Sequence, residues 1–300
     1  MSEDVAAPVF ILGAQRSGTT MLRLMLNAHG RLCVPHESVF ITELYPRLDE
    51  FGDLSQRENR CRLIDVIAAH PQVKKGGLVV DIERLKAAEV DSYPALVREI
   101  FREYMVGQGK SVWCDKSPSY TEDIDVLCRM FPDARFVHLV RDGRDVAMSQ
   151  LAISWGSNNL PRIARDWRWQ TMVCHKVGAV LPADRFMELR YEDLVLEPEQ
   201  QLRRICQFLN VPFDPGMLDY HRSADKAVPR ESLQWHRNSV SRPNVEKVLA
   251  WKTTMRRSDR VIFEQIAGDA LASFGYECLR EPADIRSRLR NLYFNVIARY

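Results

Sequence analysis

A short apolar run that ends in a glycine-rich loop and leads into a helical pattern limits the folds open to this chain. The run spans residues 8–12, the loop reads GAQRSGTT at 13–20, and apolar residues then recur at helical spacing to about residue 30. A continuous apolar run is typical of a strand buried on both faces of a parallel sheet. The same order recurs at 135–151, where FVHLV precedes RDGRDVAMSQL. We therefore predict an α/β fold with a parallel sheet flanked by helices.

The remaining patterns complete the outline of a single domain over residues 1–300. Two further short strands are predicted at 111–114 and 185–189. Residues 39–110 are mostly charged and helical in pattern, which predicts an inserted helical cap. Residues 284–300 form a basic amphipathic stretch, typical of a helix that packs against the core or a partner, with docking on a membrane as the alternative.

Charge and cysteine content exclude several kinds of partner. Lys and Arg number 42 and Asp and Glu number 40, so the balance indicates no nucleic-acid groove. The seven cysteines are scattered without metal-ligand spacing, so no metal is expected. The apolar run before Gly13 is too short for a signal peptide or a transmembrane segment, which predicts a cytoplasmic protein.

The loop at 13–20 predicts an anion site. It has the GxxxxG spacing of a phosphate-binding P-loop, in which backbone N–H groups and a helix N-terminus face the phosphate. A glycine-rich turn without a ligand is the alternative. A P-loop for ATP would carry lysine where Thr19 stands, which disfavours a kinase. The cation within the loop is Arg16, whose guanidinium can hold a terminal phosphate through two parallel hydrogen bonds.

The second strand and helix predict a second anion site. Arg141 follows the buried strand directly, and Ser149, eight residues later, shares its side if a helix starts near Asp142. The alternative is a surface charge cluster in which Asp142, Arg144 and Asp145 pair with one another. Two phosphate sites together favour a nucleotide that carries a phosphate at each end.

These two motifs resemble those of sulfotransferases that use 3′-phosphoadenosine 5′-phosphosulfate (PAPS). Over residues 9–39 and 112–151 the sequence is most similar to the tyrosylprotein sulfotransferases, which are Golgi membrane proteins. The resemblance implies PAPS as sulfuryl donor without a metal. It implies that the donor is bound by Arg16, Ser17, Gly18, Thr19, Thr20, Arg141 and Ser149, with Arg237, Ser239 and Arg242 closing over the 3′-phosphate.

The resemblance also implies the catalytic residues. Glu37 in CVPHES matches the general base, and Lys116 in WCDKSPSY matches the lysine that, with Arg16, stabilises the leaving group. His36 is the competing base, because an imidazole titrates near neutral pH. Adjacent residues of an extended segment point to opposite sides, so we expect that only one of the two faces the sulfate, and we favour Glu37.

The acceptor stays open at this stage. In-line transfer to a hydroxyl or a similar nucleophile is expected, and the acceptor can be a small molecule, a lipid, a glycan or a peptide. Two alternatives remain: a P-loop kinase for small molecules, and a non-catalytic protein that binds PAPS or its product, 3′-phosphoadenosine 5′-phosphate (PAP). The absence of lysine at Thr19 disfavours the first, and the presence of both Glu37 and Lys116 disfavours the second.

Overall fold

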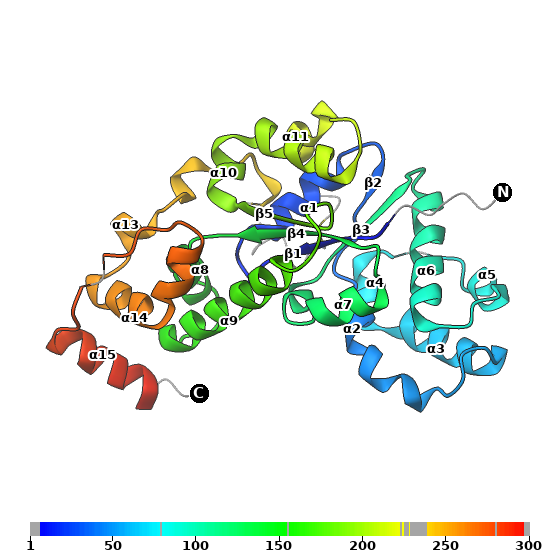
Figure 1. Cartoon of the computed structure of the whole chain (residues 1–300), viewed down its shortest axis with the longest axis horizontal. Coiled ribbons are helices and arrows are strands. Elements are labelled where there is room, and N and C mark those ends of the chain that lie inside the picture. Colours follow the sequence, from blue (N-terminus) through cyan, green and yellow to red (C-terminus); the bar gives the residue numbers. More distant parts are fainter. Residues whose placement is uncertain are drawn as a thin grey trace.

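The computed structural model describes residues 7–78, 80–154, 156–222, 224, 228, 239–279 and 281–296. Its centre is a five-stranded sheet in the order β2-β3-β1-β4-β5, and each adjacent pair of strands is parallel (Figure 1). The strands are β1 (Val9–Leu12), β2 (Leu32–Cys33), β3 (Val112–Lys116), β4 (Arg135–Val140) and β5 (Phe186–Arg190). The predicted fold class is confirmed, although the two-residue strand β2 was not predicted.

Strand register brings distant segments to one edge of the sheet. In the central strand β1, Ile11 lies opposite Lys116 of β3, and Leu12 lies opposite His138 of β4. Every residue of β1 is buried, as the apolar run predicted. Because the strands are parallel, the loop after β1, the end of β3 and the loop after β4 all meet at the carboxyl edge.

Helices cover both faces of the sheet. They are α1 (Thr19–Asn27), α2 (Phe40–Glu43), α3 (Arg57–Ala69), α4 (Pro71–Gly76), α5 (Ile82–Ala87), α6 (Tyr93–Gly107), α7 (Ile124–Met130), α8 (Gly143–Leu151), α9 (Leu160–Gly178), α10 (Tyr191–Leu196), α11 (Pro198–Leu209), α13 (Trp251–Thr254), α14 (Arg257–Ser273) and α15 (Ile285–Val296). Short 3-10 helices are η1 (Tyr45–Glu50), η2 (Pro118–Thr121), η3 (Pro215–Arg222) and η6 (Val245–Lys247). Alternate residues of β1 serve opposite faces: Val9 and Ile11 pack with α1, α10 and α11, whereas Phe10 and Leu12 pack with the helices that follow β2.

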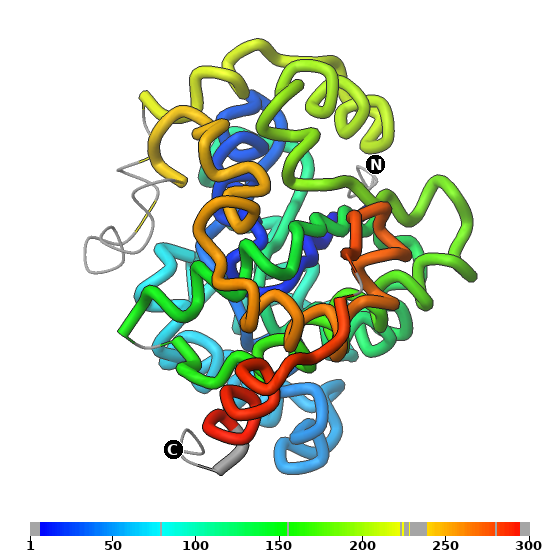
Figure 2. The backbone as a smooth tube through the Cα atoms, turned by 90° about the vertical axis from the view of Figure 1, so that its left-hand side faces the viewer, coloured from blue at the N-terminus to red at the C-terminus, as the bar shows by residue number. Residues whose placement is uncertain are grey.

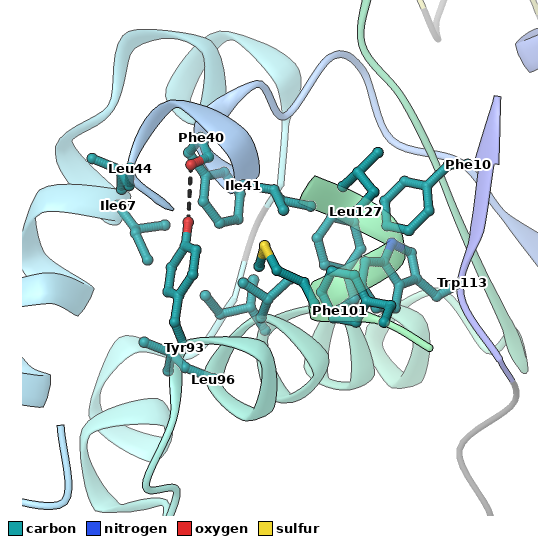
Figure 3. Packing of buried hydrophobic residues seen from close by; sticks show 14 of the residues in the cluster. Phe10, Phe40, Ile41, Leu44, Ile67, Tyr93, Leu96, Phe101, Trp113 and Leu127 are labelled. Carbon is teal, nitrogen blue, oxygen red and sulfur yellow. Dashed lines mark hydrogen bonds between the residues drawn. The ribbon is translucent and has the colours of Figure 1, made fainter. Parts of the chain in front are cut away.

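The described part of the segment between β2 and β3 contains helices and no strand. Aromatic side chains join this cap to the sheet. Phe101 of α6 stacks on Trp113 of β3 with ring centroids 4.1 Å apart, and Trp113 meets Phe10 of β1 edge-on at 5.8 Å. The Tyr93 hydroxyl donates a 2.9 Å hydrogen bond to the Phe40 carbonyl, which fixes α6 against α2 (Figure 3). These contacts hold the cap against the sheet face that carries Phe10 and Trp113.

Candidate active site

A cavity of about 1020 Å³ opens at the carboxyl edge of the sheet. Most of the predicted site residues line it: Arg16, Gly18, Thr19, Thr20, Glu37, Lys116, Arg141, Ser149 and Ser239. Ser17 is buried and Arg242 is exposed beside His221, with the Arg242 Nε 3.3 Å from the His221 Nε2, and neither lines the cavity. Arg237 lies outside the described residues. The fold thus gathers in one place residues from sequence positions 16 to 239.

The loop after β1 presents a helix N-terminus to this cavity. Gly18 precedes α1 with a φ of 93°, and no side chain caps the helix. A Cβ at Gly18 would lie 2.5 Å from the Tyr191 ring, so both the left-handed backbone and the close approach require glycine. The Thr121 hydroxyl fixes the start of this loop, because it accepts a hydrogen bond from the Gly13 N–H at 3.1 Å. Uncapped backbone N–H groups at a helix start bind anions readily.

Two arginines meet at the same end of the cavity. The Arg16 Nε donates to the Ser149 hydroxyl at 3.0 Å, and Arg141 donates to the Arg16 carbonyl at 3.2 Å. Burial, together with the nearby Arg141 charge, lowers the pKa of Arg16. The Arg141 guanidinium lies 4.5 Å from the centre of the Tyr191 ring. The positive charges of Arg16 and Arg141 together make this part of the cavity favourable for negatively charged groups such as phosphates.

The predicted charge cluster after β4 divides into two roles. Arg144 is fully buried, pairs with Asp142 at 2.7 Å and Glu264 at 2.6 Å, and stacks over the Trp251 ring. It therefore ties α8 to α13 and α14 and does not line the cavity. Arg141, by contrast, lines the cavity, and its guanidinium lies 3.9 Å from the Asp145 carboxylate. Asp142 and Arg144 thus pair as the alternative predicted, but they are buried and not at the surface, and the role of Arg141 in anion binding stays a prediction.

Glu37 and Lys116 form an ion pair in the same cavity. The Lys116 side chain is 3% exposed and that of Glu37 is 24% exposed, so the pair is open to solvent from the Glu37 side. The buried Asp115 carboxylate fixes both partners: it accepts from the Ser38 hydroxyl at 3.0 Å and from the Lys116 N–H at 2.8 Å. Tyr120 donates a further 2.8 Å bond to the same carboxylate. These contacts hold an acid–base pair in place beside the anion loop.

His36 also lines the cavity, and the backbone bends at this residue. The expectation that only one of His36 and Glu37 faces the sulfate stays a prediction. Of the two, Glu37 is the one paired with Lys116.

Several site residues were not predicted from the sequence. Arg23 of α1 is buried, donates to the Val34 and Pro35 carbonyls at 3.5 and 3.4 Å, and so supports the segment before Glu37. Burial lowers the pKa of Arg23 to about 10, against the opposing attraction of Glu37. Nothing in the helical pattern marked this arginine as buried. Tyr191 had a usable signal, since it lies two residues after the strand predicted at 185–189.

Asp115 is expected to make stability depend on pH. Burial, only partly offset by its hydrogen bonds, raises the pKa of Asp115 to about 7, whereas an unfolded aspartate titrates near ~3.9. Between these values the folded protein binds the extra proton, so the free energy of unfolding falls as pH rises. From pH 4 to 8, Asp115→Asn should gain about 2–4 kcal/mol relative to the unsubstituted protein, as measured by urea unfolding.

Asp214→Asn is the control for this prediction. Its carboxylate accepts from Gly30 and Gly216 N–H groups, which lowers the pKa of Asp214. Its contribution is present above the unfolded pKa, so the stability difference should stay flat over the same range. A flat difference for Asp115→Asn as well would contradict the assignment.

The fold and this cavity together are typical of a nucleotide-dependent transferase: the cavity is lined by a glycine-rich loop after β1, an arginine after β4, and the Glu37–Lys116 ion pair. The sequence model of the sulfotransferase family matches residues 8–215. The chain therefore belongs to the sulfotransferase family.

Known proteins agree with this assignment. The sulfotransferase domain of the Synechococcus PCC 7002 olefin synthase superposes with a TM-score of 0.63 at 26% identity, covering 92% of this chain and 98% of that domain. Protein-tyrosine sulfotransferase A of Caenorhabditis elegans is 25% identical over 91% of this chain and 68% of its own length. Protein-tyrosine sulfotransferase 1 of Danio rerio is 27% identical over 81% and 65%.

The comparisons confirm the predicted class, a PAPS-dependent sulfotransferase, and favour neither a kinase nor a non-catalytic binding protein. The chain spans about half to two thirds of the length of the first curated relatives, with 46% for the Drosophila melanogaster enzyme. Within the described residues, no helix is long and apolar enough to cross a membrane.

Proposed function

We propose that this chain transfers the sulfuryl group of PAPS to an acceptor hydroxyl by in-line displacement, with Glu37 as the base that takes the hydroxyl proton. The observation that carries the proposal is the Glu37–Lys116 ion pair inside the cavity that also receives the N-terminus of α1. Direct transfer asks the protein mainly for positioning and charge stabilisation. A fixed carboxylate and a fixed ammonium beside an anion loop supply both.

The cavity fits a nucleotide with phosphate at each end. We assign the 5′-phosphosulfate to the N-terminus of α1, with donors from Arg16, Thr19 and Thr20. Arg141 and Ser149 are assigned to the 3′-phosphate, with Ser239 beside them. Ser17 can contribute through its backbone, and the role of Arg242 stays a prediction because it does not line the cavity.

The ion pair suggests how proton removal and leaving-group stabilisation are linked. Before transfer, the Lys116 ammonium is occupied by the Glu37 carboxylate. When Glu37 takes the acceptor proton it becomes neutral and no longer holds Lys116. The ammonium charge is then available to the oxygen that bridges sulfur and phosphorus, where negative charge develops as the bond breaks. Arg16, which lines the same cavity, adds a second positive charge.

The acceptor side of the cavity is formed partly by the cap. Gln72 and Lys75 of α4, with Pro118 and Ile153, line it beside His36 and Glu37. This mixture of polar and apolar groups suits an organic molecule that carries a hydroxyl, and the matched relatives are named for protein tyrosine. We propose a hydroxyl of a protein or of a small molecule as the acceptor. The cytoplasmic location stays a prediction.

A nucleotide titration tests the donor site. At about 100 times its dissociation constant, PAP should raise the free energy of unfolding by about 2.7 kcal/mol in EDTA. AMP, which lacks the 3′-phosphate, should stabilise less at the same concentration. Arg141→Ala should weaken PAP binding by about 10- to 100-fold, because a charge-assisted contact is lost, and should leave AMP binding nearly unchanged. Thermal melting and calorimetry measure both.

Arg129→Ala is the control, since Arg129 is exposed on α7, pairs with Asp125 of the same helix, and does not line the cavity. Equal losses for PAP and AMP in Arg141→Ala would move Arg141 away from the 3′-phosphate. A larger stabilisation by ATP with Mg²⁺ than by PAP in EDTA would contradict the donor assignment itself.

A further inference from the structure

Helix α15 turns an apolar face away from the protein. Four large apolar residues on it are well exposed: Ile285 at 75%, Leu289 at 61%, Leu292 at 58% and Tyr293 at 49%. At about 100° per residue, they fall within an arc of about 100° on one side of the helix. Figures 1 and 2 place α15 at the periphery of the molecule, beyond α14.

The opposite side of α15 is already packed. Phe294 is buried among α9 and α14 residues, and its carbonyl accepts from the Asn159 side chain at 2.7 Å. Arg290 pairs with Asp259 of α14, and Asp284 caps the helix start through the Ser287 N–H at 2.8 Å. Helix α15 is therefore attached to the protein by one side, and the apolar residues on its other side are exposed. The sequence pattern suggested an apolar face packed on the core or a partner, and the described structure places that stripe on the solvent side.

Charge defines what fits this face. Arg286 and Arg288 are exposed and flank the apolar stripe on either side, at about 70–90° from its centre. The helix sequence IRSRLRNLYFNV contains no Asp or Glu. A second copy meeting this face by two-fold symmetry would bring arginines toward arginines without a carboxylate on either helix to pair with them. An anionic lipid surface offers both an apolar layer and negative charge above it.

We propose that α15 docks this chain on an anionic lipid bilayer. Ile285, Leu289 and Leu292 enter the boundary between headgroups and acyl chains, and Tyr293 lies at the same level, where aromatic rings with a polar end are favoured. Arg286 and Arg288 contact lipid phosphates. The helix lies in the plane of the surface, because 12 residues span only about 18 Å and a bilayer core measures about 30 Å.

Vesicle flotation with the full chain tests this. The protein should float with vesicles containing phosphatidylserine and bind at least about tenfold less to pure phosphatidylcholine, with the difference reduced in high salt. Leu289→Glu should abolish flotation. Arg286→Ala with Arg288→Ala should weaken binding to phosphatidylserine vesicles by about 10- to 30-fold. Because these side chains are exposed, thermal melting should stay unchanged.

Val180→Ser is the matched control: Val180 is 82% exposed and lies just beyond α9, so its variant should float like the unsubstituted chain. The proposal is overturned if the unsubstituted chain does not bind phosphatidylserine vesicles, or if Leu289→Glu binds them equally well. Light scattering without lipid should show a monomer. A dimer that Leu289→Glu dissociates would assign the face to a second copy instead.

Discussion

Replacing Glu37 by glutamine is expected to lower turnover by about 10²–10⁴-fold while nucleotide affinity changes little, because the general base is lost and the side chain keeps its size. That loss corresponds to about 3–5 kcal/mol of barrier. The neutral amide can still accept a hydrogen bond from Lys116, so the surrounding loop should stay in place. Single-turnover transfer from labelled PAPS to a hydroxyl acceptor, with PAP binding measured in parallel, gives both quantities.

His36→Gln is the control for this variant, because His36 lines the same cavity one residue away. It should retain activity within about tenfold, and its profile against pH should match that of the unsubstituted enzyme. If His36→Gln abolishes transfer while Glu37→Gln stays active, the imidazole is the base and the Glu37 assignment is wrong. If both variants stay active, neither side chain removes the proton.

Replacing Lys116 by methionine is expected to lower the turnover number by about 10²–10³-fold, the usual loss when a donor to developing negative charge is removed. Methionine has a similar length and keeps the buried stem packed, so the effect reports the ammonium. The variant also leaves Glu37 without its partner. Breaking a buried pair costs up to ~3–5 kcal/mol, but Glu37 can reach solvent, so a smaller loss of stability is expected here.

The double variant of Glu37 and Lys116 distinguishes a shared catalytic role from two independent roles. If proton uptake by Glu37 is what releases Lys116, the Glu37→Gln, Lys116→Met double variant should be about as slow as the slower single variant. Fully additive losses would show that the residues act independently. Lys75→Met is the control, since Lys75 lines the cavity from the cap, and an equally large loss there would contradict the leaving-group role of Lys116.

The sheet and the loop at 13–20 could be predicted because short-range sequence patterns specify both. A buried parallel strand requires a continuous apolar run, and a tight anion loop requires glycine, so residues 8–30 specify their own structure. The placement of Arg141 and Ser149 near this loop also followed, since parallel strands end at the same edge. Strand β2 escaped prediction because two residues carry no periodicity.

The chemistry of the site depended on contacts that no local pattern encodes. Glu37 and Lys116 are 79 positions apart, and only their resemblance to a family suggested that they act together. They are brought together by the pairing of β2 with β3, because Glu37 follows β2 and Lys116 ends β3, and by the Asp115 carboxylate, which accepts from both the Ser38 hydroxyl and the Lys116 N–H.

By itself, the sequence determined the alternation of helices with the four longer strands, the glycine-rich loop and the amphipathic character of the last helix, because periodicity, glycine positions and charge are local properties. Only the tertiary structure decided which charges face the cavity and which face of α15 meets solvent. Arg141 and Arg144 lie three residues apart in one motif, yet one lines the cavity and the other is consumed by Asp142 and Glu264. Such outcomes depend on partners distant in the chain, and burial makes each unpaired charge costly enough that those partners fix its place.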